Sequence, residues 1–317
     1  MKKLLISILV TLVTASAHAN PQFTPDMSLL MTSDQEREQP DQIPGHHQHP
    51  YIAIFKKDGK TLIYLATRHD FEHTLDMVDY VYANFQPQIT VVEFERINRT
   101  LRNRCCDNEF EYSIGISADK DIPFTLADLY DQDILNILAK TDPNIYNIYQ
   151  ARWTVGNALA HERQFGTSTT AEAEAVNFKQ HVWKENMPKP MDAQELKNWF
   201  KKHFNIDFNK TNFTELFQEG WRSPSSAGTV FNKYSEKRDL LARDPFMLQN
   251  ITAALNKYDT VYAAFGEGHY RCHRKVLEQM LGKPKYIWTV TNFADRSYQS
   301  FADDNNKIKE EILVPYP

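Results

Sequence analysis

The pattern of hydrophobic and polar positions becomes regular at residue 51. Two runs rich in β-branched and aromatic residues, 51–55 and 61–66, flank the dipeptide Asp58-Gly59. Such runs predict strands, and Asp-Gly favours the tight turn that joins two antiparallel strands. The pattern therefore predicts a β-hairpin at the start of the regular fold.

A helix, a buried strand and a series of helices are expected next. Apolar residues three or four positions apart predict a helix over 71–85, and the β-branched run 89–92 predicts a buried strand that ends at Glu93. Helical spacing recurs at 126–139, 144–165 and 170–183, and a capping box of Asp192 and Glu195 introduces a further helix that reaches Phe204. The centre of the chain is therefore expected to be mostly helical.

The last third alternates between helix and strand. We expect a helix over 234–255, with a break at Asp244-Pro245, where aspartate caps a helix and proline takes its first position. A strand over 258–265, a helix over 270–281 and a strand over 286–291 follow. This order predicts an α/β fold: a central mixed sheet flanked by helices, with a long helical insertion at approximately 126–232 that forms a lid or second layer.

Residues 1–19 have the features of a cleavable signal peptide. Lys2 and Lys3 precede an apolar run at 4–13, and Ala17-His18-Ala19 is a small-x-small cleavage site. A membrane anchor is the alternative, but a membrane span needs about 20 apolar residues. We therefore expect a bacterial protein that is exported to the periplasm or secreted, with no stable membrane insertion after cleavage.

The rest of the chain is expected to form one domain. Residues 20–50 are rich in proline and polar residues without sustained periodicity, which predicts a flexible extension, and 51–317 would then be a single α/β domain. Hydrophobic residues make up 42% of the chain, enough for a substantial core. The net charge of −5 argues against nucleic acid or an anionic membrane as the main partner, so a peptide or small-molecule substrate is expected.

The cysteines allow several interpretations. Export favours oxidation, so Cys105 or Cys106 could form a disulfide bond with Cys272. Alternatively all are thiols, because sequence spacing does not show whether two Cα atoms approach closely enough. Cys272 also stands between His269 and His273 at an electropositive helix start that could lower its pKa, so a nucleophilic cysteine is a further alternative.

Two strand-to-helix junctions carry residues suited to metal binding. His69 and His269 each follow a predicted strand, and Glu93 ends the strand that lies between them in sequence. Ligands of open α/β sheets bind outside the carboxyl ends of the strands, so these distant side chains can converge. Two neutral imidazoles and a carboxylate are common ligands of a hydrolytic divalent ion, and Zn, Mn and Co all accept them. We therefore predict a divalent metal site, although a single strand-end histidine is more often not a ligand.

A second histidine follows each of these by four residues. On a helix this spacing places His73 on the face of His69 and His273 on the face of His269. Each pair could chelate an ion alone, but we favour hydrogen-bond donors behind the ligands, or solvated residues. The sequence has no nucleophile elbow, zinc-protease helix, P-loop or dinucleotide fingerprint, so other catalytic templates fit poorly.

The same motifs, taken in order, resemble the Tiki/TraB/GumN superfamily. They are Ala66-Thr67-Arg68-His69 after a strand, the strand-ending Glu93, a helix motif that begins Arg243-Asp244-Pro245-Phe246-Met247, and Gly266-Glu267-Gly268-His269 after a later strand. Together they span roughly residues 51–292. The resemblance implies an α/β fold with a site at the sheet edge, and its Tiki branch implies a divalent-metal-dependent protease.

The resemblance also assigns roles. It makes His69 and His269 metal ligands, Glu93 a ligand or general base, and Arg243 a residue that orients Glu93 or stabilises an oxyanion. The structural alternatives are an ion-paired Arg243 and an Asp244 that only caps its helix. Glycines 266 and 268 would permit close backbone approach at the site.

The chain departs from the Tiki branch at two positions. Ala66 stands where the family shows glycine, and Pro245 interrupts the helix motif. The superfamily also includes erythromycin-esterase-like hydrolases and haem-binding ChaN-like lipoproteins, so fold alone does not decide function. Our first hypothesis is an exported metal-dependent hydrolase of a peptide, amide or ester bond. The alternatives are a non-catalytic metal- or haem-binding protein, with Tyr270 as an axial ligand, and an inactive member that acts as an interaction factor.

Overall fold

The computed structural model describes residues 23–32, 35, 50–67, 74–95, 108–216, 230–284, 286–289 and 309–317. The predicted signal peptide at 1–19, most of the extension at 20–50, His69, His73, Cys105 and Cys106 lie outside the described residues. Within the extension, the backbone of Phe23 exchanges hydrogen bonds of 2.6 and 3.0 Å with the side chain of Asn256. Phe23 is buried, so this part of the extension packs on the fold.

The described strands form one mixed sheet of six strands in the order β4-β3-β5-β2-β1-β6. Strands β1 (Tyr51–Lys57) and β2 (Lys60–Thr67) pair antiparallel, and β6 (Tyr286–Thr289) pairs antiparallel with β1. Strands β3 (Ile89–Glu95), β4 (Phe124–Asp128) and β5 (Thr260–Gly266) run parallel, with β5 between β2 and β3. The predicted α/β class with a mixed sheet is confirmed.

The hairpin forms as its sequence predicts. Lys57 pairs with Lys60, and the intervening Asp58 and Gly59 have φ angles of 51° and 79°. Left-handed backbone at both turn residues is what a two-residue hairpin turn requires, and Asp-Gly tolerates it.

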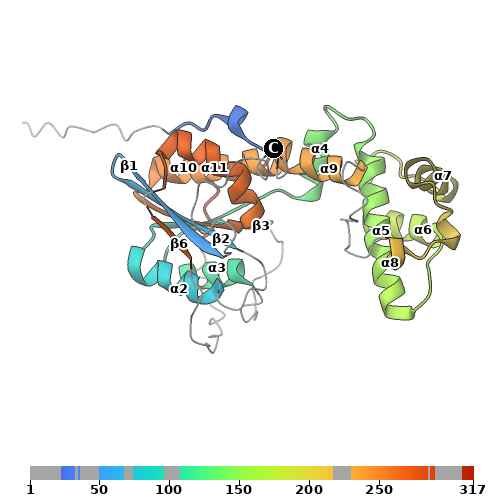
Figure 1. Cartoon of the computed structure of the whole chain (residues 1–317), viewed down its shortest axis with the longest axis horizontal. Coiled ribbons are helices and arrows are strands. Elements are labelled where there is room, and N and C mark those ends of the chain that lie inside the picture. Colours follow the sequence, from blue (N-terminus) through green and yellow to red (C-terminus); the bar gives the residue numbers. More distant parts are fainter. Residues whose placement is uncertain are drawn as a thin grey trace, which may run out of the picture.

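Helices cover both faces of the sheet (Figure 1). On one face, α2 (Thr74–Phe85) and α3 (Glu109–Asp119) pack against side chains such as Ile52 and Ile63. On the other, α10 (Asp244–Lys257) and α11 (Glu267–Leu281) pack against Tyr51 and Tyr64. Because successive side chains of a strand point to opposite faces, the alternation in β1 and β2 divides the core into these two layers.

The remaining helices form a separate group beside the sheet (Figure 1). They are α4 (Asp131–Leu138), α5 (Ile145–Phe165), α6 (Ala171–His181), α7 (Ala193–Phe204), α8 (Phe213–Leu216) and α9 (Val230–Arg238). This helical segment has its own apolar core, which includes Leu196 and Phe200 of α7. The predicted capping box is present: Asp192 accepts from the Glu195 backbone, and Glu195 accepts from that of Asp192.

Two local predictions differ from the structure, and one helix was not predicted. The helix predicted over 126–139 is wrong at its start, because Phe124–Asp128 is strand β4 and the helix begins at Asp131. Helix α3 was not predicted. The expected break at Asp244-Pro245 is absent, because a π-helical segment, Asp239–Arg243, carries the chain from α9 directly into α10. In the described part of the chain, no helix is both long and apolar enough to span a bilayer.

Candidate functional site

Three parallel strands bring the site together at their carboxyl ends. Glu93 lies near the end of β3, and its Oε2 accepts a hydrogen bond of 2.6 Å from the backbone N–H of Gly266, where β5 ends. Its Oε1 lies 3.2 Å from Nε2 of His269, in the first turn of α11. The structure thus brings two of the predicted metal ligands, Glu93 and His269, into contact.

Arg243 holds the Glu93 carboxylate in place. Its Nη2 donates to Glu93 Oε1 at 2.8 Å, and its Nε and Nη2 bind both oxygens of Asp128, at the end of β4, at 2.8 and 2.5 Å. Its Nη1 donates to Asp239 at 3.3 Å. Every nitrogen of the guanidinium therefore binds a carboxylate, which fits the orientation of Glu93 and leaves Arg243 little capacity to stabilise an oxyanion.

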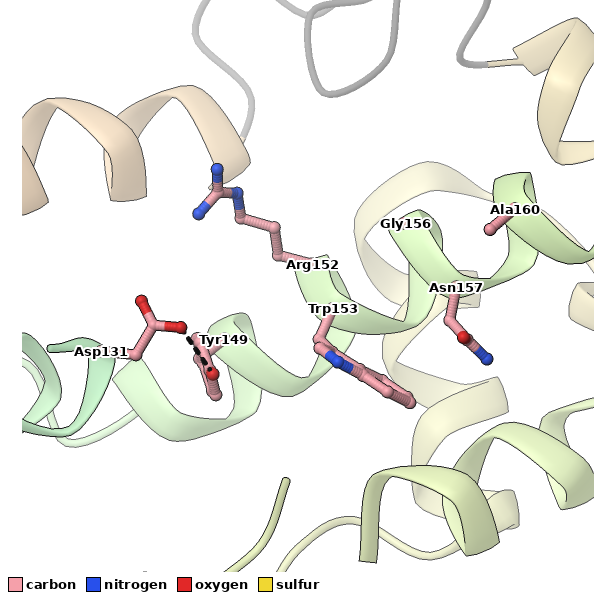
Figure 2. A pocket seen from close by; sticks show the side chains of 7 residues that line it. All are labelled: Asp131, Tyr149, Arg152, Trp153, Gly156, Asn157 and Ala160. Carbon is pink, nitrogen blue, oxygen red and sulfur yellow. Dashed lines mark hydrogen bonds between the residues drawn. The ribbon is translucent and has the colours of Figure 1, made fainter. Parts of the chain in front are cut away.

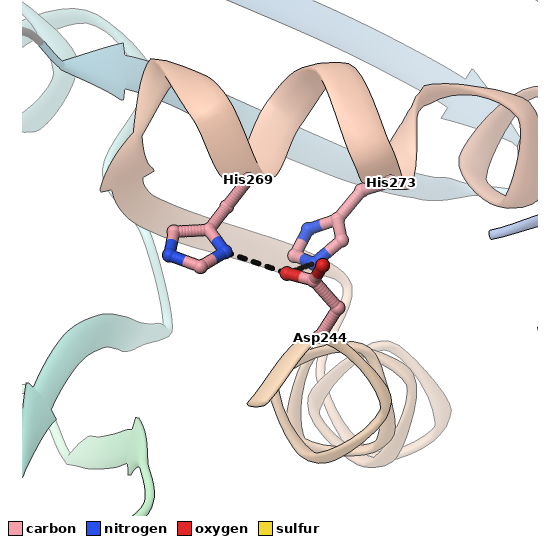
Figure 3. Close-up of side chains that lie close together, drawn as sticks. All are labelled: Asp244, His269 and His273. Carbon is pink, nitrogen blue, oxygen red and sulfur yellow. Dashed lines mark hydrogen bonds and ion pairs between the residues drawn. The ribbon is translucent and has the colours of Figure 1, made fainter. Parts of the chain in front are cut away.

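A buried carboxylate joins the histidines of α11. Oδ1 of Asp244 lies 2.5 Å from Nδ1 of His269 and 3.0 Å from Nε2 of His273 (Figure 3). Asp244 and His273 are fully buried. The helix-cap interpretation of Asp244 is wrong, since its side chain binds the histidines and makes no cap hydrogen bond.

Among the described residues, the second oxygen of Asp244 has no hydrogen-bond partner. Oδ2 is buried and accepts no hydrogen bond from any described residue. On the far side of the cluster, Nδ1 of His273 lies 3.1 Å from the hydroxyl of Tyr64, in β2. Burial lowers the pKa of His273 despite its contact with Asp244, so its ring is neutral. A neutral His273 donates from Nε2 to Asp244 and accepts at Nδ1 from the Tyr64 hydroxyl.

His269 carries a proton that its carboxylate neighbours stabilise. Burial alone would lower its pKa, but the charges of Glu93 and Asp244 outweigh burial and raise the pKa to about 10. For the carboxylates, burial acts in the opposite direction and would raise the pKa of Glu93 and of Asp244. The charge and hydrogen bonds of His269 outweigh burial and hold both pKa values well below their ordinary range. Without a bound ion, the site is therefore an imidazolium between two carboxylates.

The residues present fit a metal ion. Asp244, His269 and His273 each offer a ligand atom, and these atoms lie within 4.8 Å of one another. The unpartnered Oδ2 of Asp244 is a buried acceptor that a cation would satisfy. The other ring nitrogens of the histidines lie beside Glu93 and Tyr64. With an ion at Nε2 of His273, the ring proton would move to Nδ1 and be donated to the Tyr64 hydroxyl, as ligating histidines commonly donate their second N–H outward. The cluster could therefore hold a metal ion.

The structure brings together some of the site residues predicted from the sequence and does not describe others. Glu93, Arg243 and His269 lie in one network of contacts. The place of His69 stays a prediction, since it lies outside the described residues. His273 and Asp244 were underestimated, although the four-residue spacing after His269 was a signal for His273. Asp128 had no usable signal, because its segment was predicted to be helical.

Three other residues that the sequence suggested for the site are Tyr270, Cys272 and Gly268. Tyr270 is fully buried, and its ring packs edge-on against those of Tyr51 and Tyr64 at centroid distances of 5.2 and 4.9 Å. Its ring is therefore part of the core, and its role as an axial haem ligand stays a prediction. Cys272 is buried, and its pairing stays a prediction. A Cβ at Gly268 would meet no atom within 4 Å, so close approach does not explain that glycine.

Known proteins provide no assignment of function for this chain, so a functional proposal must be based on its geometry and motifs. No protein-family model matches the chain, and no curated protein and no solved structure matches it either. The resemblance to the Tiki/TraB/GumN superfamily is therefore carried by the motifs that the sequence contains.

Proposed function

We propose that the chain is an exported divalent-metal-dependent hydrolase that acts on a peptide, amide or ester bond. The observation that carries the proposal is the convergence of Glu93, Arg243, Asp244 and His269 at the carboxyl edge of the sheet, around a carboxylate oxygen without a partner. The resemblance of the motifs to the Tiki branch supports the same reaction. Zn, Mn and Co are the proposed ions, because imidazole and carboxylate ligands suit all of them.

A divalent ion held at this cluster would supply Lewis acidity, which polarises a carbonyl group and makes water more acidic. The protein residues prepare the charge around it. His269, Arg243 and the Gly266 amide lower the pKa of Glu93 and keep it anionic, so it suits a fixed negative charge beside His269 better than a general base. Release of the His269 proton frees a ring nitrogen as a ligand.

The cluster has a buried side and a slightly exposed side. The side chains of Asp244 and His273 are 1% and 0% exposed, whereas those of Glu93, Arg243 and His269 are 11, 12 and 10% exposed. Substrate would therefore approach along Glu93, Arg243 and His269, while Asp244 and His273 fix the geometry from behind.

A peptide-library cleavage assay with the tag-free, metal-loaded protein tests the proposal. We expect wild-type cleavage that a chelator abolishes, and a decrease of at least about 100-fold in Glu93→Gln, a loss typical when a charge-stabilising group is removed from an active site. Glu185→Gln is the matched control. Glu185 is exposed in the helical segment, so this variant should retain full activity. Cleavage that persists with chelator, or equal activity of both variants, would contradict the proposal.

A binding protein that holds the ion without turnover is the second candidate. The complete burial of Asp244 and His273 favours it, because a substrate has no access to an ion from the side of these two residues. Stoichiometric metal together with no cleavage of peptide, amide or ester libraries would select this candidate over the hydrolase.

A further inference from the structure

The helical segment contains a pocket, one lining residue of which follows closely on the candidate site along the chain. It has a volume of about 340 Å³ and is lined by one face of α5 and by Asp131, at the start of α4 (Figure 2). Asp131 follows Asp128, which binds Arg243, by only three positions. Three residues of chain span at most about 10 Å, so one wall of the pocket lies close to the candidate site.

The lining residues of α5 recur at helical spacing. They are Tyr149, Arg152, Trp153, Gly156, Asn157 and Ala160. Residues such as Ala151, Val155 and Ala158 are buried in the helical core instead. A glycine inside a helix costs about 1 kcal/mol relative to alanine, so Gly156 is not there for helix stability. Its position in the pocket lining accounts for it, because a larger side chain would reduce the space.

The pocket presents opposite charges. Arg152 lies with its guanidinium 5.5 Å from the centre of the Tyr234 ring. Burial and the nearby positive charge of Arg238 lower the pKa of Arg152, although the charges of Asp131 and Asp239 oppose that shift, so a further anionic group beside the guanidinium would favour its charged form. Asp131 accepts a hydrogen bond of 3.0 Å from the Tyr149 hydroxyl through Oδ2, and a carboxylate can accept further hydrogen bonds from a ligand donor.

Contacts with helix α6 fix the aromatic wall of the pocket, which is formed by Tyr149 and Trp153. The ring of Trp153 packs edge-on against Phe178 of α6 at 5.4 Å, and Tyr149 packs on the same phenylalanine at 6.1 Å. Asn157 donates a hydrogen bond of 2.7 Å to Glu174, also in α6. These contacts hold the wall in place before any ligand arrives, which reduces the ordering cost of binding.

We propose that this pocket binds the C-terminal residue of a peptide, a proposal that rests on the hydrolase function and names its substrate class. Arg152 binds the α-carboxylate of this C-terminal residue, and Asp131 accepts a hydrogen bond from its N–H. Trp153 and Tyr149 pack against its aromatic or aliphatic side chain. A free amino acid offers the same carboxylate and, in place of the amide N–H, an ammonium group that Asp131 would also bind, so the test separates the two sources.

Calorimetric titration of the metal-free protein tests the pocket without turnover. The probes are acetyl-glycyl-phenylalanine, its C-terminal amide and free phenylalanine. We expect the peptide acid to bind at least tenfold more tightly than the amide and than the free amino acid. Equal binding of acid and amide would overturn the proposal, and equal binding of free phenylalanine would overturn the assignment to a peptide.

Substitutions locate the binding. Arg152→Gln should abolish the preference for the acid, whereas Arg163→Gln, at an exposed arginine near the end of the same helix, should preserve it. Because Arg152 contacts Tyr234, a second variant guards against misfolding: Ala160→Leu, at an exposed pocket-lining position, should weaken binding of every probe while the circular dichroism spectrum is unchanged. Undiminished binding in Ala160→Leu would overturn the proposal.

The two proposals fail separately. Preference for the peptide acid without any hydrolysis would contradict the hydrolase function and leave the peptide site intact. Hydrolysis by a protein that binds acid and amide equally would contradict the pocket assignment alone.

Discussion

His269 is the residue on which the electrostatics of the site depend. It lies between Glu93 and Asp244, and its proton balances one of the two negative charges when no ion is bound. A divalent cation that binds here must displace that proton. Metal affinity is therefore coupled to pH through this side chain.

The imidazole of His269 should titrate far above the usual range in the metal-free protein. We expect a pKa of about 10, because attraction to Glu93 and Asp244 outweighs burial. Since the folded-state pKa is raised above the ordinary value near 6.5, the stabilising contribution is complete below about pH 6.5 and is lost as the pH rises through about 10. Proton–nitrogen NMR of the ring measures the titration, and a midpoint near 6.5 would contradict the buried network.

Asp244→Ala should strongly destabilise the metal-free fold. It removes the acceptor of both histidines and leaves the buried His269 cation with a single carboxylate, which typically costs about 3 kcal/mol of the free energy of unfolding. Urea unfolding measures the loss. Asp207→Asn is the control, because Asp207 pairs with Lys210 at the surface and should leave the urea midpoint unchanged.

At the residue scale, sequence reasoning identified Glu93, Arg243 and His269 but underestimated their partners. Strand ends and motif spacing place those three on one edge. The bonds from Asp244 to the histidines depend on how α10 packs against α11, which the spacing within either helix does not specify. An aspartate before a proline also has the local signature of a helix cap, which concealed its role.

At the element scale, the junction between the π-helical segment and α10 contacts both the sheet and helix α11. Arg243 and Asp244 are consecutive, and consecutive helical residues point about 100° apart. Arg243 therefore reaches Glu93 and Asp128 on the strands, while Asp244 reaches the histidines of α11. The lack of an α-helical ladder at Asp239–Arg243 also accommodates Pro245, which has no N–H to donate.

The short strand β4 and helix α3 show where periodicity fails. The apolar residues of Phe124–Asp128 merge with the helical pattern that follows, and a run of this length does not distinguish a buried strand from a helix. Helix α3 has apolar and small residues on several sides, but Asn108 caps it through the amides of Phe110 and Glu111. That cap was the available signal for α3.

Asp192→Ala tests whether the helical segment is independent of the metal cluster. Loss of the capping box at α7 should lower the free energy of unfolding by about 1 kcal/mol. Metal affinity, measured by calorimetry, should remain unchanged because α7 contributes no residue to the cluster. A matching loss of metal affinity would show that the helical segment and the cluster are coupled.

At the scale of the whole molecule, the parallel strands β3, β4 and β5 explain why the site forms. Their carboxyl ends supply Glu93, Asp128 and Gly266, and α11 begins directly after β5 with His269 in its first turn. The sequence predicted this edge from strand order. It did not reveal how the helical segment lies beside the sheet, because that depends on its separate core.

A bound divalent ion should stabilise the whole fold. At a free ion concentration 100 times the dissociation constant, the expected gain is about 2.7 kcal/mol. The gain at a fixed ion concentration should increase from pH 6 to pH 8, because the His269 proton competes with the ion more weakly at higher pH. Thermal unfolding with and without ion at both pH values measures this, and a gain independent of pH would place the ion elsewhere.

Metal analysis of the tag-free protein after dialysis against a trace of zinc measures whether the cluster of Asp244, His269 and His273 holds an ion. We expect one tightly bound ion per chain in the wild type and less than a tenth of that in His269→Ala, since His269, among the described histidines, contacts both Glu93 and Asp244. Wild-type protein without stoichiometric metal, or His269→Ala that retains it, would contradict the account.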